Sequence, residues 1–239
     1  MYQNIYKGIF VRRLNRFLAL IFVENKLNLV HIKNTSRCKE IFQPGVLCYV
    51  QKTNNPNRKT KYTLISALKF NKLINLDSVI TNDLVYKGLV EKYILSELNP
   101  INIKREVKYL TSRFDISFYS QKYKKDYFLE VKGVSLESNG IAAFPGAPTK
   151  RGTKHLEELI QAVKDGYGAI IIFVIQLKEV SLLVPHFKMD PLFSNLLIKA
   201  YEHGVMVKAY NSIVTRNNIE LYKEIEVSFD EKYSNNFRI

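Results

Sequence analysis

The sequence has few of the residues and motifs on which several common kinds of site depend. Its only cysteines, Cys38 and Cys48, have no metal-type spacing and no matching pair of histidines. The glycine-rich loops of nucleotide-binding proteins are missing, as are the Gly-x-Ser-x-Gly and His-Glu-x-x-His patterns of hydrolases. These absences argue against a zinc module, a P-loop enzyme and a serine hydrolase. We expect both cysteines to be free thiols in a reducing cytoplasm, and nothing in their spacing supports the alternative of a disulfide.

Long apolar runs are also missing. The longest extends from Ala169 to Ile175, which is far too short to span a bilayer. The first seven residues lack the order of charged and apolar regions that marks a signal peptide. We therefore expect a cytoplasmic protein without a membrane partner. Hydrophobic residues make up 46% of the 239 residues, which is enough for a substantial core.

Acidic residues are scarce in the first third of the chain. Residues 1–78 contain 14 lysines and arginines but only three acids, a net charge of +11, whereas residues 79–239 contain 22 bases and 19 acids, a net charge of +3. A bias in composition over the whole chain would not concentrate the charge in this way. The pattern indicates a basic module that binds a polyanion, joined to a second unit. The alternative is a basic surface without a function.

Short runs of β-forming residues fill the basic module. Apolar stretches at residues 17–23, 27–32, 46–50, 62–68 and 72–76 are separated by turn residues, and they predict five short strands. Five strands in a small basic domain are compatible with an OB-type barrel, a frequent binder of single-stranded nucleic acid, and also with other β-barrels. Phe17 and Tyr62 are candidates for stacking on bases, or they belong to the core. We place this OB-like domain at residues 1–78.

Residues 79–222 predict a mixed-sheet α/β domain, and residues 223–239 a polar tail. A helical pattern at 79–98 precedes strands at 103–110, 113–119 and 127–134, of which the last two form a hairpin. An irregular segment (137–150) is followed by a helix (153–165), a buried strand (169–176), a second helix (191–203) and a strand (205–210). Residues 219–222 are expected to form an edge strand. The fold class is α/β (α+β), a barrel followed by a mixed sheet with helices.

The predicted hairpin carries the most informative residues. Glu130 and Lys132 point to the same face of a strand, and pairing of the two strands places Asp115 beside Glu130. Two carboxylates suit Mg²⁺, which prefers oxygen ligands, and Lys132 would orient a water molecule or neutralise charge at a scissile phosphate. Asp115, Glu130 and Lys132 are therefore the candidate catalytic residues of a phosphodiester hydrolase.

Mg²⁺ would bind Asp115 and Glu130, with Glu106 on the preceding strand as a third ligand. Without a metal the two carboxylates would repel each other, and the pKa of one would rise. The alternatives are a solvent-facing cross-strand pair for Glu130 and Lys132 and an exposed strand position for Glu106.

The start of the helix predicted at residues 153–165 is basic. His155 has Arg151 and Lys154 beside it, and a helix N-terminus with such neighbours suits a phosphate group. A capping or packing role is the alternative for His155.

Many short motifs then occur in one order along the chain. The most specific is Phe144-Pro145-x-Ala147-x-Thr149-x-Arg151-Gly152-x-Lys154-His155-Leu156-x-Glu158-Leu159. The others are Arg12-Arg13-x-x-Arg16-Phe17-Leu18-Ala19, Asn34-Thr35, Pro44-Gly45, Arg58-Lys59, Lys61-Tyr62-Thr63-Leu64, Glu106-Val107-Lys108-Tyr109, Ser112-Arg113-x-Asp115 and Glu130-Val131-Lys132. Over about residues 8–222 the chain resembles the sugar fermentation stimulation protein A family.

The resemblance implies an N-terminal OB-like domain and a C-terminal domain of the PD-(D/E)xK nuclease type. It also implies DNA binding and a role in regulating sugar (maltose) utilisation genes, and it leaves nuclease activity open, because for the family that activity is inferred from the fold. We therefore expect a DNA-binding protein, with a Mg²⁺-dependent nuclease as the alternative. The residues expected to contact the nucleic acid are Arg12, Arg13, Arg16, Asn34, Arg58, Lys59, Lys61, Arg151, Lys154 and His155.

The chain also departs from the family pattern. The usual Asn-Thr-Gly is Asn34-Thr35-Ser36, the usual Phe-Pro-Asp-Ala is Phe144-Pro145-Gly146-Ala147, and Lys150 and Lys87 stand where the family has glutamates. Loss of acids around the expected metal site weakens the case for cleavage. The case for nucleic-acid binding is untouched, since added lysines favour phosphate contacts.

Overall fold

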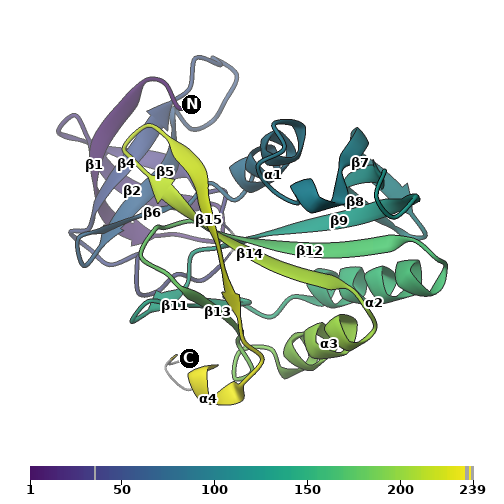
Figure 1. Cartoon of the computed structure of the whole chain (residues 1–239). Coiled ribbons are helices and arrows are strands. Elements are labelled where there is room, and N and C mark those ends of the chain that lie inside the picture. Colours follow the sequence, from purple (N-terminus) through teal and green to yellow (C-terminus); the bar gives the residue numbers. More distant parts are fainter. Residues whose placement is uncertain (35, 235–236, 238–239) are drawn as a thin grey trace.

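The N-terminal third of the chain closes into a barrel in a computed structural model that describes residues 1–34, 36–234 and 237 (Figure 1). Its strands lie in the order β3-β2-β1-β4-β5-β6, and β3 also pairs in parallel with β5. This pairing closes five strands into a barrel of the predicted OB type. The strands are β1 (Ile5–Arg13), β2 (Leu18–Val23), β3 (Lys26–His31), β4 (Leu47–Lys52), β5 (Tyr62–Lys69) and β6 (Lys72–Asn75).

Strand β1 was not among the predicted strands, although it lies in the middle of the barrel between β2 and β4. Its inward positions are Gly8 and Phe10. A Cβ atom at Gly8 would come within 2.6 Å of the Ile21 side chain, so glycine allows β1 to approach β2 closely. Glycine also weakens the strand signal, and the run therefore lacks a clear apolar alternation. Of the two aromatics considered for stacking, Tyr62 is buried and Phe17 is exposed.

The rest of the chain forms a nine-stranded mixed sheet in the order β10-β11-β13-β15-β14-β12-β9-β8-β7. Its strands are β7 (Pro100–Tyr109), β8 (Ser112–Ser120), β9 (Lys125–Val134), β10 (Glu137–Ser138), β11 (Ile141–Phe144), β12 (Gly168–Ile175), β13 (Leu182–Pro185), β14 (Met206–Val214) and β15 (Ile219–Val227). All eight residues of β12 are buried, as the continuous apolar run predicted.

Helices cover both faces of this sheet (Figure 1). Leu84 and Val85 of α1 (Ile80–Val90) pack in one hydrophobic cluster with Ile172, on one side of β12. Helices α2 (Lys150–Lys164) and α3 (Pro191–Glu202) pack on the other side, in a cluster that includes Phe173. That second cluster continues into the barrel, so the two domains share a core.

Two expectations for the end of the chain were wrong. Strand β15 is an interior strand, because it pairs with β13 as well as β14. It also runs to Val227, so the first residues of the predicted tail belong to the sheet, and Ile225 packs in the core. A short helix, α4 (Glu231–Ser234), and a buried Phe237 follow, whereas residues 235–236 and 238–239 of the tail lie outside the described residues. Among the helices that the structure describes, none is long and apolar enough to cross a membrane.

Candidate active site

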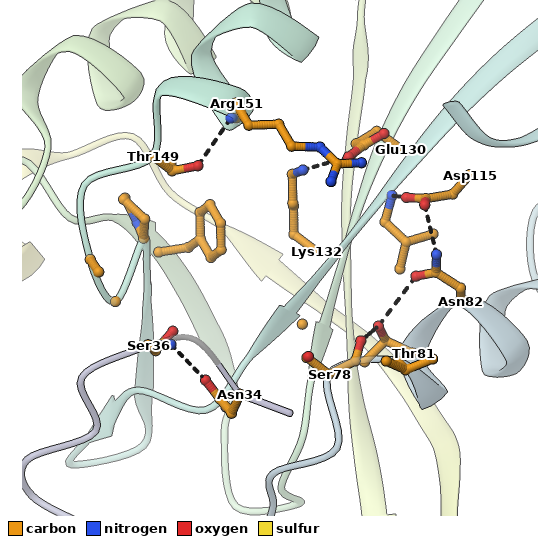
Figure 2. Close-up of a pocket in the computed structure, with 18 of the residues that line it drawn as sticks. Asn34, Ser36, Ser78, Thr81, Asn82, Asp115, Glu130, Lys132, Thr149 and Arg151 are labelled. Carbon is orange, nitrogen blue, oxygen red and sulfur yellow. Dashed lines mark hydrogen bonds and ion pairs between the residues drawn. The ribbon is translucent and has the colours of Figure 1, made fainter. Parts of the chain in front are cut away.

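A cavity of about 460 Å³ lies between the barrel and the mixed sheet (Figure 2). Strands β8 and β9 contribute its floor, and Asn34 and Ser36 from the barrel contribute one wall. The start of α1 and the segment that leads into α2 complete it. The residues that carry polar or charged side chains into this cavity are Arg16, Asn34, Ser36, Ser78, Thr81, Asn82, Glu106, Asp115, Glu130, Lys132, Thr149 and Arg151.

Asp115 and Glu130 meet on the cavity floor because of the hairpin register. Ile116 pairs with Leu129 in the antiparallel ladder, so the residues one step further, Asp115 and Glu130, lie side by side. Asp115 is held on both oxygens: Oδ2 accepts a hydrogen bond from the Val131 amide (2.8 Å) and Oδ1 accepts one from Asn82 Nδ2 (2.6 Å). Asn82, on α1, was missed by the sequence analysis because its partner lies 33 residues away.

Burial and the neighbouring charge change the acidity of Asp115. Removal from water, followed by the proximity of Glu130, raises its pKa from 3.8 to about 6. Hydrogen bonds from Val131 and Asn82 and the charge of Lys132 oppose this rise and do not cancel it. A buried carboxylate of this kind favours a bound cation, since a cation would remove the repulsion between the two acids.

Glu130 has the opposite electrostatic balance. Burial would raise its pKa, but contacts with His155 and Lys132 outweigh burial, and the pKa is lowered below the ordinary value. Its Oε1 lies 2.5 Å from Lys132 Nζ and 2.6 Å from His155 Nδ1. Its Oε2 is buried and has no hydrogen-bond partner among the described residues. The side chain is therefore ionised and keeps one oxygen free for a cation.

His155 lies beneath Glu130 and not at the surface. The side chain is 3% exposed and stands edge-on to Phe114 with ring centres 5.8 Å apart. Its Nε2 accepts a hydrogen bond from Arg151 Nε (3.4 Å), which places the ring proton on Nδ1, facing Glu130. His155 thus positions the carboxylate, while Arg151 is exposed and lines the cavity (Figure 2). Lys154, its other basic neighbour, points to the Thr111 carbonyl.

Two adjacent arginines of β1 have different roles. Arg12 is exposed, whereas Arg13 stacks on Phe42 (4.7 Å) and donates hydrogen bonds of 2.6 to 3.0 Å to five main-chain carbonyls. Burial lowers the pKa of Arg13, and these bonds occupy its guanidinium. Arg13 therefore holds the two loops that form the barrel wall of the cavity. The carbonyls belong to Asn15, Arg16, Asn34, Ser36 and Arg37.

A second hollow of about 480 Å³ continues from the first one. It shares Arg16, Ala147 and Pro148 with the cavity, and it is also lined by Arg13 and Arg37. We call the two hollows together the interdomain groove. Arg37 was missed by the sequence analysis because a lone arginine in a loop carries no local signal.

Other predicted contact residues lie outside the interdomain groove. Arg58, in the loop before β5, donates hydrogen bonds to Thr60 and Thr63 and lines a separate hollow on the barrel. Lys59 and Lys61 line neither part of the groove. Glu106 lines the cavity, but within the described residues no three acidic, histidine or cysteine side chains lie close enough together to hold a metal ion.

Two of the departures from the family pattern face each other across the cavity wall. A Cβ atom at Gly146 would lie 3.0 Å from Ser36 Oγ, so the serine occupies space next to the glycine. Lys87 does not line the cavity and lies 3.9 Å from Glu91 on the exposed side of α1. Thr35, between Asn34 and Ser36 in the family motif, lies outside the described residues.

Comparisons with known proteins agree with this architecture. Residues 11–76 match the family model for the SfsA N-terminal OB domain, and residues 79–218 match that for the sugar fermentation stimulation protein RE domain. Sugar fermentation stimulation protein homologues from Clostridium beijerinckii and Ruminiclostridium cellulolyticum are each 43% identical over 95% of this chain and 98% of their own length.

A solved structure, that of Pyrococcus furiosus SfsA in complex with Ca²⁺, has a similar fold. It superposes with a TM-score of 0.87 at 29% identity and covers 96% of this chain and 98% of its own. Both domains and nearly the whole length are thus matched in one protein family. The chain belongs to the sugar fermentation stimulation protein family.

Proposed function

We propose that this protein binds DNA along the interdomain groove. The observation that carries the proposal is the placement of exposed Arg16, Arg37 and Arg151 around one continuous hollow between the two domains. A net charge of +11 on the first 78 residues supports it, because a basic surface attracts the phosphate backbone. DNA binding at this groove would also serve the role in regulating sugar (maltose) utilisation genes that the family resemblance implies.

A salt titration of binding tests this proposal. The affinity for a labelled DNA should fall steeply as salt rises, and replacing Arg16 and Arg37 by alanine should weaken binding and flatten the dependence of log K on log salt by about two contacts. Lys122 and Lys124, in the exposed β8–β9 turn away from the groove, provide a control with the same change of charge. Equal affinity of the Arg16/Arg37 variant and the wild type would contradict the assignment.

Divalent-cation-dependent hydrolysis of the bound strand is the second candidate function. A specific observation favours it: the buried Oε2 of Glu130 has no partner among the described residues and stands beside Asp115, whose pKa is raised. Carboxylate oxygens are the ligands that Mg²⁺ and Ca²⁺ prefer, and Mg²⁺ commonly uses only one or two of them. The residues present therefore fit such an ion, and the P. furiosus relative was solved with Ca²⁺.

Each residue of the floor would then have a distinct role. Asp115 and Glu130 would hold the cation, and the cation would polarise a phosphoryl oxygen and lower the pKa of a bound water. Lys132, held by Glu130, would place its positive charge beside the scissile phosphate. His155 and Asn82 would keep the two carboxylates in position, and Arg151 would contact the phosphate from the cavity wall.

A comparison of variants tests hydrolysis. Cleavage of DNA with Mg²⁺ or Mn²⁺ should be lost in Asp115→Ala and in Lys132→Ala, and Ca²⁺ should raise the melting temperature of the wild type more than that of Asp115→Ala. Glu106→Gln tests the predicted third ligand, and we expect less than a tenfold effect because Glu106 lies outside the pair. Identical background rates for the wild type and both alanine variants would exclude hydrolysis of the DNA tested.

A further inference from the structure

The width of the interdomain groove is set by buried polar contacts between the two domains. Gln176, after β12, donates hydrogen bonds to Asn75 Oδ1 (2.8 Å) and to the Asp77 carbonyl (3.0 Å), and its own carbonyl accepts one from the Asn75 amide (2.9 Å). Glu137 is buried and pairs with Lys72 (2.8 Å) and Lys69 (3.5 Å) of the barrel. Opening the groove would break these bonds.

The barrel wall of the cavity is fastened in the same way. Asn34 is 4% exposed, and its Nδ2 donates a hydrogen bond to Ser135 Oγ of the sheet domain (3.2 Å). Arg13 ties the adjacent loops together through their carbonyls. Each buried polar group left without its partner costs about 1–3 kcal/mol, so the wall is held at one distance from the carboxylates.

The reactive groups lie deep behind this wall. The side chain of Glu130 is 3% exposed and that of Lys132 is 15% exposed. A phosphate can reach them only by entering a hollow of about 460 Å³, a size suited to one small molecule or one nucleotide unit (roughly 300–1,000 Å³ for small-ligand sites). In a duplex the phosphates lie on the outside of a stiff stack of base pairs, and the partner strand accompanies each of them.

We propose that the interdomain groove accepts single-stranded nucleic acid and excludes a duplex. The strand runs from the hollow beside Arg37, past Arg16, into the cavity above Lys132, since the two hollows join at Arg16. This inference rests on the proposed function and adds the class of its substrate. A duplex would need the two walls to separate, which the Gln176, Glu137 and Asn34 contacts oppose.

Fluorescence anisotropy of the intact wild-type protein, in EDTA so that nothing is cleaved, provides the test. The probes are one labelled DNA strand of about 20 nucleotides, longer than the roughly 4–16 nucleotides that one OB fold covers, its blunt duplex, and the same duplex with a single-stranded tail. The single strand should bind at least tenfold more tightly than the blunt duplex at equal salt, and the tail should restore most of the affinity. Arg16→Ala should weaken binding of the single strand, and Lys122→Ala should not.

The outcomes separate this inference from the proposed function. If the blunt duplex binds as tightly as the single strand and Arg16→Ala weakens both equally, the single-strand inference is wrong while DNA binding at the groove stands. If neither probe binds more tightly than to the Arg16/Arg37 variant, both proposals are wrong. An RNA strand of the same sequence, bound as well as the DNA strand, would retain the single-strand inference and widen its substrate.

Discussion

The floor and the rim of the interdomain groove differ in almost every physical property. On the floor, Asp115 and Glu130 are removed from water, and their side chains are held by hydrogen bonds and ion pairs. On the rim, Arg16, Arg37 and Arg151 are exposed and carry positive charge. A charge in water contributes through attraction over a distance and is screened by salt, whereas a buried charge acts locally and strongly. The rim is therefore suited to binding and the floor to chemistry.

The largest effect should follow from removing one charge of the floor. Glu130→Gln preserves the volume of the side chain but leaves Lys132 and His155 without their negative partner. We expect hydrolysis to fall about 10³-fold and the free energy of unfolding to drop by about 3 kcal/mol. Cleavage assays and urea unfolding at one pH measure the two effects. Retention of cleavage within about tenfold of the wild type would show that the floor is not the reactive part.

The rim depends on a buried arginine beside exposed ones. Arg13→Ala removes five hydrogen bonds to carbonyls, and the free energy of unfolding should drop by about 3 kcal/mol. Arg12→Ala, one residue earlier and exposed, should change it by less than about 0.5 kcal/mol. Urea unfolding compares the two variants directly. Equal losses would mean that Arg13 is a surface charge like its neighbour.

The floor should also respond to pH in a direction that the rim does not share. Because folding raises the pKa of Asp115 from 3.8 to about 6, the folded state binds more protons between these values, and the wild type loses stability as pH rises through them. Asp115→Asn lacks this loss. Relative to the wild type, the variant should gain about 2 kcal/mol between pH 3.8 and pH 7. Urea unfolding in EDTA at several pH values measures it, and a difference that is flat with pH, or of opposite sign, would be inconsistent with a buried Asp115.

The smallest effect should come from the cavity wall, where Ser36 and Gly146 share space. An aspartate at 146 would press on Ser36, so Gly146→Asp alone should destabilise the protein by about 1–2 kcal/mol. Adding Ser36→Gly should recover about 1 kcal/mol of this, as for other residues in contact. Thermal unfolding of both single variants and the double variant completes the cycle. Strict additivity would show that the two departures from the family pattern are independent.

Much of the floor could be predicted because its geometry is local. A hairpin joins the strands that carry Asp115 and Glu130, and alternation of side chains then sets which residues share a face. The helix that begins after Thr149 and the one that begins after Asp190 follow from the same kind of short-range signal, since both caps are side chains that bond within three residues. Strand β1 escaped because Gly8 answers to a neighbouring strand and not to its own sequence.

The roles of single charged side chains depended on partners far along the chain. His155 and Arg13 belong to motifs expected to touch a phosphate, but the fold buries the first beneath Glu130 and ties the second to loops around residues 15 and 34–37. Arg58 and Lys154 remained on other surfaces. A basic residue has the same local pattern whether it faces solvent, a carbonyl or a ligand, so only packing distinguishes these cases.

The sequence by itself determined the family, the order of the two domains and the pairing of Asp115 with Glu130, because these rest on motifs, on the distribution of charge and on strand periodicity. Only the tertiary structure decided that the barrel forms one wall of the cavity, that His155 supports Glu130, and that Gln176, Glu137 and Asn34 hold the groove at one width. These features are contacts between residues up to 101 positions apart, and such contacts leave no periodic trace in the sequence.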